Sequence, residues 1–170
     1  MKCIYNEVCT EEVLLELQSV DAQREGYVTR IEWYRDRYLG LAKTFVVKSD
    51  DDKNLGYAVI VGTNPDVYEI IKNGYISGDY SLSPRAYMAA RDRTKNLYMV
   101  VSVVDDDFTA EKELTEPMKN MVAGSTVVCI VNDYKFVSQF QINQSSRTMS
   151  EVTDAVELMI GEVCEGCTTQ

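Results

Sequence analysis

The sequence contains no histidine among its 170 residues. This absence excludes catalytic triads built on histidine, removes the most common general base and argues against most zinc sites. Long apolar runs are also missing, since no stretch approaches the roughly 20 residues that a membrane helix needs. The first residues turn acidic at once and lack the apolar region of a signal peptide. We therefore expect a cytoplasmic protein with no membrane partner.

Basic residues are scarce, with 17 Lys and Arg against 27 Asp and Glu and a formal net charge of −10. Nonspecific nucleic-acid binding requires a basic surface, so we expect no nucleic-acid partner. Four residues could form a local basic patch, although a solvated helix end explains them more simply. They are Arg85, Arg91, Arg93 and Lys95. The acidic balance favours a basic partner or no particular one.

The cysteines show no pattern typical of a disulfide framework or a metal site. There are five, and an odd number in a chain of cytoplasmic character argues against disulfides. Cys164 and Cys167 form one CxxC pair, but a zinc site would need a second pair or histidines, and Cys3 and Cys9 are not suitably spaced. Cys129 lies in an apolar stretch typical of a buried, inert thiol. We expect no metal site.

Five stretches rich in β-branched and apolar residues predict strands. They span residues 2–5, 42–48, 55–61, 97–104 and 125–131. The second and third flank a polar turn and form a hairpin. The fourth is nearly all apolar, with Ser102 as its one small polar residue, which is typical of a central strand covered on both faces. The fourth and fifth enclose a helix and should pair in parallel.

Capping residues and apolar spacing predict the helices. Thr10 is a candidate N-cap of the first helix, and Thr29 opens a capping box for the second. Pro65 and Pro84 each open a short helix. Three further helices are expected at residues 109–123, 134–140 and 148–160. Pro117 should kink the first of these or move its start later. The length suits one α/β domain over residues 1–163 with a disordered tail at 164–170.

The order strand, two helices, hairpin, long strand, helix, strand, helix resembles the Gcn5-related N-acetyltransferases, the GNAT family. Four stretches carry the resemblance, which covers about residues 2–140. They read RDRYLGLAKTFVVKSDDDKNLGYAVIVG, NPDVYEIIKNGYISGDYSLSP, KNLYMVVSVVDDDF and VVCIVNDYKFVSQF. The resemblance implies a GNAT-like α/β fold with a mixed central sheet flanked by helices.

The resemblance also implies binding of acetyl-CoA or another acyl-CoA. In the family, central-strand amides bond the pantetheine arm where the strand separates from its parallel neighbour. The pyrophosphate then rests on the next turn and helix start, where free N–H groups and the helix dipole favour anions. The matching positions are Val101, Ser102, Val103, Val104, Thr109, Ala110, Lys112 and Leu114.

Two departures from the family pattern stand out. The pyrophosphate turn usually reads Arg/Gln-x-x-Gly-x-Gly/Ala, but here Thr109, Lys112 and Leu114 take the three key positions. Glu111 and Glu113 add charges that repel a pyrophosphate. Near the C-terminus, the family has an aromatic-Gly-aromatic turn followed by two more strands, whereas here the turn reads Phe140-Gln-Ile142 and a predicted helix at 148–160 follows. We therefore expect the acceptor-side hairpin to be replaced or absent.

Acetyl transfer needs a base for the acceptor amine and an acid for the leaving CoA thiolate. By resemblance, Tyr134 is the candidate acid, although it could simply cap the edge of the core. Asp105, Asp106 and Glu69 are candidate bases, and an ordinary solvated turn is the alternative for the first two. Three tyrosines could line an acceptor cleft or a subunit contact, or lie half-buried with a wet hydroxyl. They are Tyr75, Tyr80 and Tyr87.

Two functions therefore stay open. The first is an N-acyltransferase that moves an acyl group from acyl-CoA to a small-molecule or peptide amine, with a homodimer as a further possibility. The second is a catalytically inactive GNAT-like binding or regulatory protein that has lost the pyrophosphate loop. A third, weaker hypothesis is an acidic protein that covers a basic surface.

Overall fold

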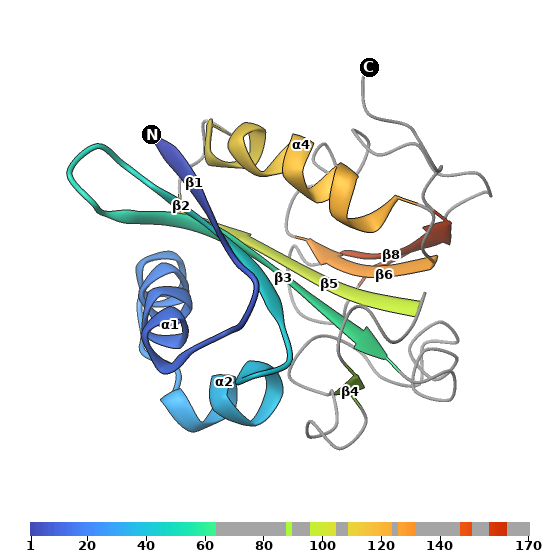
Figure 1. The fold of residues 1–170 in the computed structure, drawn as a ribbon, viewed down its shortest axis with the longest axis horizontal. Helices are drawn as coiled ribbons and strands as arrows, with labels where there is room; N and C mark the ends of the chain where they lie inside the picture. The colour runs from blue at the N-terminus through green and yellow to red at the C-terminus, as the bar shows by residue number, and fades with distance from the viewer. Residues whose placement is uncertain are drawn as a thin grey trace.

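A computed structural model describes residues 1–63, 88–89, 96–104, 109–123, 126–131, 147–150 and 157–162. These residues form a mixed eight-stranded sheet with the order β1-β2-β3-β5-β6-β8-β7, and β4 pairs with β3 beside this path (Figure 1). The strands are β1 (Lys2–Asn6), β2 (Lys43–Lys48), β3 (Asn54–Thr63), β4 (Met88–Ala89), β5 (Asn96–Val103), β6 (Thr126–Val131), β7 (Arg147–Ser150) and β8 (Glu157–Glu162). The helices of this part of the chain are α1 (Glu11–Glu25), α2 (Ile31–Tyr38) and α4 (Thr109–Val122).

The ladder between β5 and β6 is parallel, and the other ladders of the described sheet are antiparallel. The expected hairpin of β2 and β3 and the expected parallel pair of β5 and β6 are therefore confirmed. The helices cover opposite faces of the sheet, with α1 and α2 on one side and α4 on the other (Figure 1).

Each face of the sheet holds its own hydrophobic cluster. On the α1 side, Leu14, Leu17 and Tyr34 pack over strand residues that include Val59 and Val100. On the α4 side, the buried helix residues pack over Ala58, Ile60 and the odd-numbered residues of β5. Those helix residues are Ala110, Leu114, Met118 and Val122. The apolar run of β5 is thus covered on both faces, as its composition predicts.

Local capping decides where α1 and α2 begin. The Thr10 hydroxyl accepts a hydrogen bond from the Val13 amide at 3.3 Å, which confirms Thr10 as an N-cap. At α2 the N-cap is Arg30, which makes no side-chain cap bond, so the predicted capping box at Thr29 does not form. The carbonyl of Thr29 instead accepts from the Gln18 amide at 2.7 Å, which ties the interhelical segment to α1.

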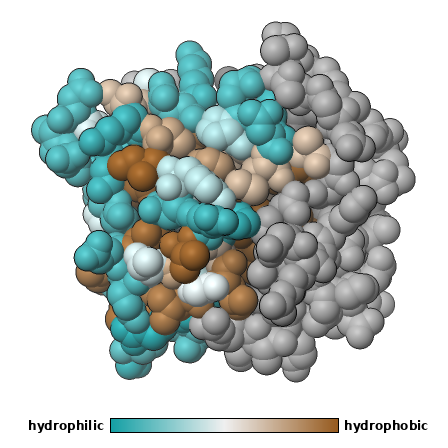
Figure 2. Space-filling model, viewed as in Figure 1, coloured by the Kyte–Doolittle hydropathy of each residue, from teal (hydrophilic) through white to brown (hydrophobic). Residues whose placement is uncertain are grey.

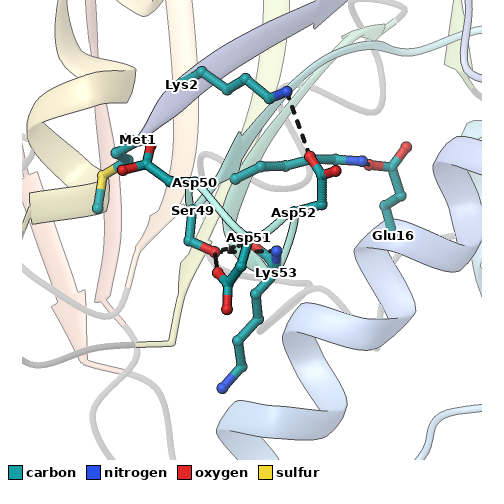
Figure 3. Close-up of polar contacts among 9 residues, drawn as sticks. Met1, Lys2, Glu16, Ser49, Asp50, Asp51, Asp52 and Lys53 are labelled. Atoms are coloured by element: carbon teal, nitrogen blue, oxygen red, sulfur yellow. Dashed lines mark hydrogen bonds and ion pairs between the residues drawn. The ribbon is translucent and has the colours of Figure 1, made fainter.

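The turn between β2 and β3 is held by polar contacts to β1 and within itself (Figure 3). The Ser49 hydroxyl donates to the Asp51 carboxylate, and Lys2 lies 3.4 Å from Asp52. At the start of the turn, Lys48 pairs with Glu16 of α1 at 2.8 Å. The pair of Lys2 and Asp52 is exposed, and exposed pairs add little stability, so the hairpin depends mainly on its ladder and its apolar faces.

The predicted helix at residues 148–160 is wrong. Residues Arg147–Ser150 and Glu157–Glu162 form β7 and β8, which pair antiparallel, and β8 also pairs antiparallel with β6. The capping box at Thr148 and the apolar spacing are local signals that favour a helix. The edge of β6 supplies backbone hydrogen-bond partners to Glu157–Glu162, and this pairing with a distant segment favours a strand instead. The two late strands that the family resemblance implies are therefore present, and the expected replacement or absence of this hairpin is wrong.

A second correction concerns the helix predicted from Pro84 to about residue 92. Met88–Ala89 form β4, which pairs with β3 at Gly62 and Thr63. Of the two alternatives expected for Pro117, a kink or a later start, the later start is wrong, because α4 begins at Thr109 and contains Pro117. The predicted helices after Pro65 and at residues 134–140, and the predicted tail at 164–170, lie outside the described residues.

In the part of the chain that the structure describes, none of the helices combines the length and hydropathy required to span a bilayer. Figure 2 shows one face of the molecule, on which hydrophilic residues line the outer margin and hydrophobic residues gather toward the middle of the described half.

Candidate functional site

The backbone pairing between the central strands β5 and β6 stops before either strand ends. Their parallel ladder runs from the pair Asn96 and Thr126 to the pair Val100 and Ile130. Beyond it, β5 continues to Val103 in its ladder with β3, and β6 continues to Val131 in its ladder with β8. Each strand keeps its outer neighbour while losing the inner one. The described sheet therefore opens between β5 and β6 from Val101 onward.

The carbonyl of Val101 and both backbone groups of Val103 point into this opening. Val104 donates its amide to the Leu55 carbonyl of β3 at 2.9 Å. Because backbone groups of a strand alternate between its two edges, Ser102 also faces β3, while Val101 and Val103 face the opposite edge. Among the described residues of β6, which end at Val131, none is in register with either valine, and the last pair of the ladder uses only the amide of Val101. We call the Val101 carbonyl and the backbone of Val103 the open edge of β5.

A close approach at Gly56 places the start of α4 against the end of β5. A Cβ atom on Gly56 would lie 2.9 Å from the Val103 Cγ1 atom, 3.2 Å from the Ser102 carbonyl oxygen and 3.4 Å from the Ala110 Cβ atom. Only a residue without a side chain permits this packing. Gly56 thus lets the first turn of α4, with its free N–H groups, approach the strand that carries the open edge.

The first turn of α4 carries mixed charge. Lys112 and Glu113 are exposed, whereas Glu111 is buried with a residue exposure of 5%. The helix N-terminus favours an anion, Lys112 adds to that attraction, and the two glutamates oppose it. The turn retains the dipole of a phosphate site without the glycines that would let its backbone enclose a phosphate.

The predicted cofactor residues differ in which of their atoms a ligand could contact. The side chains of Val101, Val103, Ala110 and Leu114 pack in the cluster beneath α4. The side chain of Val104 packs against the cluster on the opposite face. A ligand could reach these five positions only through their backbone. Thr109 is half-buried at the helix start and Lys112 is exposed.

The remaining predicted residue, Ser102, belongs to a buried polar cluster that the sequence analysis missed. Its hydroxyl donates to Asp21 Oδ1 at 2.8 Å. The hydroxyls of Tyr34 and Tyr57 donate to Asp21 Oδ2 at 2.6 and 2.9 Å. Four elements, α1, α2, β3 and β5, meet at this one carboxylate. We call these four residues the Asp21 cluster.

Burial dominates the electrostatics of the Asp21 cluster. Loss of hydration raises the pKa of Asp21 above 3.8, and the bonds from Tyr34, Ser102 and Tyr57 offset this only in part. Arg24, the nearest described cation, lies 4.0 Å from Oδ1 and is itself paired with Glu25 at 2.6 Å. The carboxylate is thus held chiefly by neutral hydroxyl donors.

The sequence held a signal for this cluster. Asp21 follows Leu14 by seven residues and Leu17 by four, which puts it on the buried face of α1. Ser102 is the small polar residue in the apolar run of β5. An acid on one buried face and a hydroxyl on another have to be paired, because an unpaired buried polar group is costly. Only the three-dimensional packing shows that they pair with each other.

The thiols of Cys3 and Cys9 are poor candidates for chemistry. Burial raises the pKa of Cys3 to about 11 and that of Cys9 to about 12, so both stay protonated near neutral pH. No group of three or more acidic, cysteine or histidine side chains that could hold a metal occurs among the described residues.

Several predicted residues lie outside the described positions. They are Tyr134, Asp105, Asp106, Glu69, Tyr75, Tyr80, Tyr87, Arg85, Arg91, Arg93, Lys95, Cys164 and Cys167. Their roles stay predictions.

Comparison with known proteins gives a clear result only for structure. No protein-family model matches the chain, and no curated protein matches it significantly. A crystal structure of histone acetyltransferase HPA2 and related acetyltransferase from Corynebacterium glutamicum matches with a TM-score of 0.53 at 9% identity, over 98% of this chain and 99% of that chain.

A GNAT superfamily phosphinothricin acetyltransferase from Sinorhizobium meliloti, solved in complex with AcCoA, matches with a TM-score of 0.54 at 10% identity. The match covers 100% of this chain and 93% of that chain. Identities this low establish the fold alone. The protein has a GNAT-like α/β fold, which confirms the fold predicted from its sequence.

Proposed function

We propose that this protein binds an acyl-CoA along the open edge of β5 and transfers the acyl group to an amine. The observation that carries the proposal is the end of the β5–β6 ladder at Val100 and Ile130, while both strands continue. A gap between two parallel central strands leaves backbone donors and acceptors in need of partners.

A pantetheine arm is a suitable partner for these groups. It is narrow and carries amide groups along its length, so it can add to the open edge as an extra strand would. The apolar side chains of Val101 and Val103 are already packed, which leaves their backbone as the contact surface. The start of α4 lies close to the end of β5 and supplies N–H groups for the phosphates.

Turnover would follow ordinary acid–base chemistry. A base removes a proton from the acceptor amine, the amine attacks the thioester carbonyl, and an acid protonates the departing thiolate. Tyr134 is the proposed acid, by its resemblance to the family position. The acceptor is a small-molecule or peptide amine.

A catalytically silent binding protein is the second candidate. The observation that favours it is the first turn of α4, which has no glycine from Thr109 to Leu114 and carries Glu111 and Glu113. Such a protein would keep the GNAT-like fold and bind its ligand weakly or without turnover.

A thermal shift assay tests the binding step. Acetyl-CoA, CoA and desulfo-CoA should each raise the unfolding midpoint, because a ligand that binds only the folded state stabilises it by mass action. Absence of a shift with all three at millimolar concentration would contradict acyl-CoA binding.

A charge variant tests the phosphate contact separately. Glu113→Gln removes an exposed negative charge from the first turn of α4. We expect CoA to bind up to about fivefold more tightly, since an exposed charge pair is worth roughly 0.2–1 kcal/mol. Titration calorimetry with CoA and with pantetheine, which lacks the phosphates, measures the effect. An equal gain for pantetheine would place the phosphates elsewhere.

Release of free CoA thiol in the presence of amines tests catalysis. Tyr134→Phe should reduce turnover while leaving CoA affinity nearly unchanged. Equal turnover in this variant would remove Tyr134 as the acid. CoA binding without turnover on any amine tried would favour the silent binding protein.

A further inference from the structure

The Asp21 cluster lies beside the open edge of β5. Ser102 is the residue between Val101 and Val103, and its cross-strand partner on β3 is Tyr57. Both hydroxyls of this pair donate to the same carboxylate, Ser102 to Oδ1 and Tyr57 to Oδ2. Asp21 therefore bridges β3 and β5 from the face of the sheet, two residues beyond the last β5–β6 pair.

This bridge acts where β5 has lost half of its backbone support. Up to Val100 the strand has a ladder on each edge, and from Val101 to Val103 the described residues continue only the ladder with β3. Ser102 and Tyr57 are each 2% exposed, Tyr34 is fully buried and the Asp21 side chain is 13% exposed, so the bridge is largely shielded from water. Hydrogen bonds to a buried, ionised acceptor are stronger than bonds between neutral groups.

We propose that Asp21 is a positioning residue for the open edge: its ionised carboxylate, through the Ser102 hydroxyl, fixes the backbone of Val101 and Val103 for ligand binding. The inference rests on the proposed acyl-CoA function, since that function supplies the ligand for the edge. Asp21 touches no ligand itself and acts through Ser102.

The charge of Asp21 controls the strength of the bridge. The ionised carboxylate accepts from three hydroxyls, whereas the protonated group is a weaker acceptor and carries a donor of its own. One of the three hydroxyls would then have to turn away. The charged or titratable groups facing Asp21 from the described elements are Arg24 of α1, Tyr34 of α2 and Tyr57 of β3, and β5 contributes the neutral Ser102.

The first test measures CoA affinity by titration calorimetry between about pH 4.5 and pH 8. The variants are Asp21→Asn and Ser102→Ala, with Glu12→Gln, an exposed acid on the same helix, as the control. At neutral pH both variants should bind CoA about three- to tenfold more weakly than wild type, which corresponds to the loss of one charge-assisted bond. As the pH falls, wild type should approach Asp21→Asn, while Glu12→Gln follows wild type.

The second test needs no ligand. The ¹³Cα chemical shifts of Val101 and Val103, which report backbone angles, should follow the titration of Asp21 in wild type. They should stay constant with pH in Asp21→Asn. In Ser102→Ala, Asp21 still titrates but the link to the strand is gone, so the two shifts should also stay constant. If the two shifts still changed with pH in Ser102→Ala, the electric field of the Asp21 charge alone would explain the change. That result would overturn the proposal.

The two tests separate the possible failures. If wild type binds no CoA, the proposed function fails, and the chemical shifts alone decide whether Asp21 positions the strand. If CoA binds with equal affinity and equal pH dependence in wild type and Asp21→Asn, the positioning role fails and the proposed function stands. Ser102→Ala provides the same comparison if Asp21→Asn does not fold.

Discussion

At the scale of single residues, Asp21 links stability to pH. Burial raises its pKa above the ordinary value of 3.8 in spite of three hydroxyl donors. The pKa of Asp21 is therefore higher in the folded state than in the unfolded state. Between these two pKa values, the folded state binds the proton more tightly. The contribution of Asp21 to the free energy of unfolding is most favourable below pH 3.8 and is lost as the pH rises through the folded pKa.

The variant Asp21→Asn isolates this contribution, because asparagine has no charge to bury. We expect the free energy of unfolding of wild type to decrease relative to that of Asp21→Asn as the pH rises from acidic to neutral. Urea unfolding of both proteins at a series of pH values measures the difference, with Glu12→Gln as the exposed control. If the free energy of unfolding of wild type instead rose relative to that of Asp21→Asn with increasing pH, the pKa of Asp21 would be lowered in the folded state.

Gly56 is a second residue whose effect depends on one close contact. Gly56→Ala should lower the free energy of unfolding by about 1–3 kcal/mol, the usual cost of overpacking, because its Cβ would lie 2.9 Å from Val103. It should also weaken CoA binding, since relief of the clash moves the end of β5 or the first turn of α4.

Gly26→Ala is the matched control for this substitution. Gly26 ends α1 with a φ of 83°, and a Cβ added there would have no heavy atom within 4 Å, so alanine adds backbone strain without a clash. Urea unfolding should show a loss of roughly 1 kcal/mol, with CoA affinity unchanged. Equal CoA affinity in both variants would separate the Gly56 contact from the ligand site.

At the scale of elements, the start of α1 shows what a capping residue contributes. Thr10→Ala removes the bond to the Val13 amide and should lower the free energy of unfolding by about 1 kcal/mol. Thr29→Ala is the control, because α2 has no side-chain cap and Arg30 occupies its N-cap position. That variant should change the free energy of unfolding by less than about 0.5 kcal/mol in the same urea assay. A larger loss for Thr29 would show that its hydroxyl has a structural role.

Elements also differ in how far local sequence predicts them. The helix α1 is correctly predicted because Thr10, its apolar spacing and Gly26 are all local signals. The segment of β7 and β8 carries a helix-like capping box at Thr148 yet forms strands, because its backbone partners are on β6. Pairing between distant segments cannot be read from the spacing of one segment.

At the scale of the whole molecule, one sheet couples two hydrophobic clusters. Leu17 lies in the cluster beneath α1 and α2, and Leu114 lies in the cluster beneath α4. Both side chains are fully buried. The only tryptophan, Trp33, packs against the first cluster and reports on that face alone. Alternate residues of β3 and β5 contribute to both clusters, so the two faces should unfold together.

This coupling can be measured with Leu114→Ala. The substitution should lower the free energy of unfolding by about 2–5 kcal/mol, and it should shift Trp33 fluorescence and far-UV circular dichroism to the same lower urea midpoint. Leu17→Ala, on the face that carries Trp33, is the reference. If Leu114→Ala shifted the dichroism but left the fluorescence transition in place, the two faces would be separate folding units.

The sequence by itself determined the order of β1, α1, α2, β2, β3, β5, α4 and β6 and the covering of β5 on both faces. These features follow from patterns of apolar, β-branched and capping residues that act within a few positions. The same patterns supported the GNAT resemblance that the structural comparison confirms.

Only the tertiary structure decided the late hairpin, the point where β5 leaves β6, and the Asp21 cluster. Each depends on groups far apart in the chain, such as Asp21 and Ser102 at 2.8 Å across 81 positions. A buried carboxylate must find donors, and a strand edge must find partners, but the chain order does not say which. Packing makes that choice, because it brings the distant groups within bonding distance.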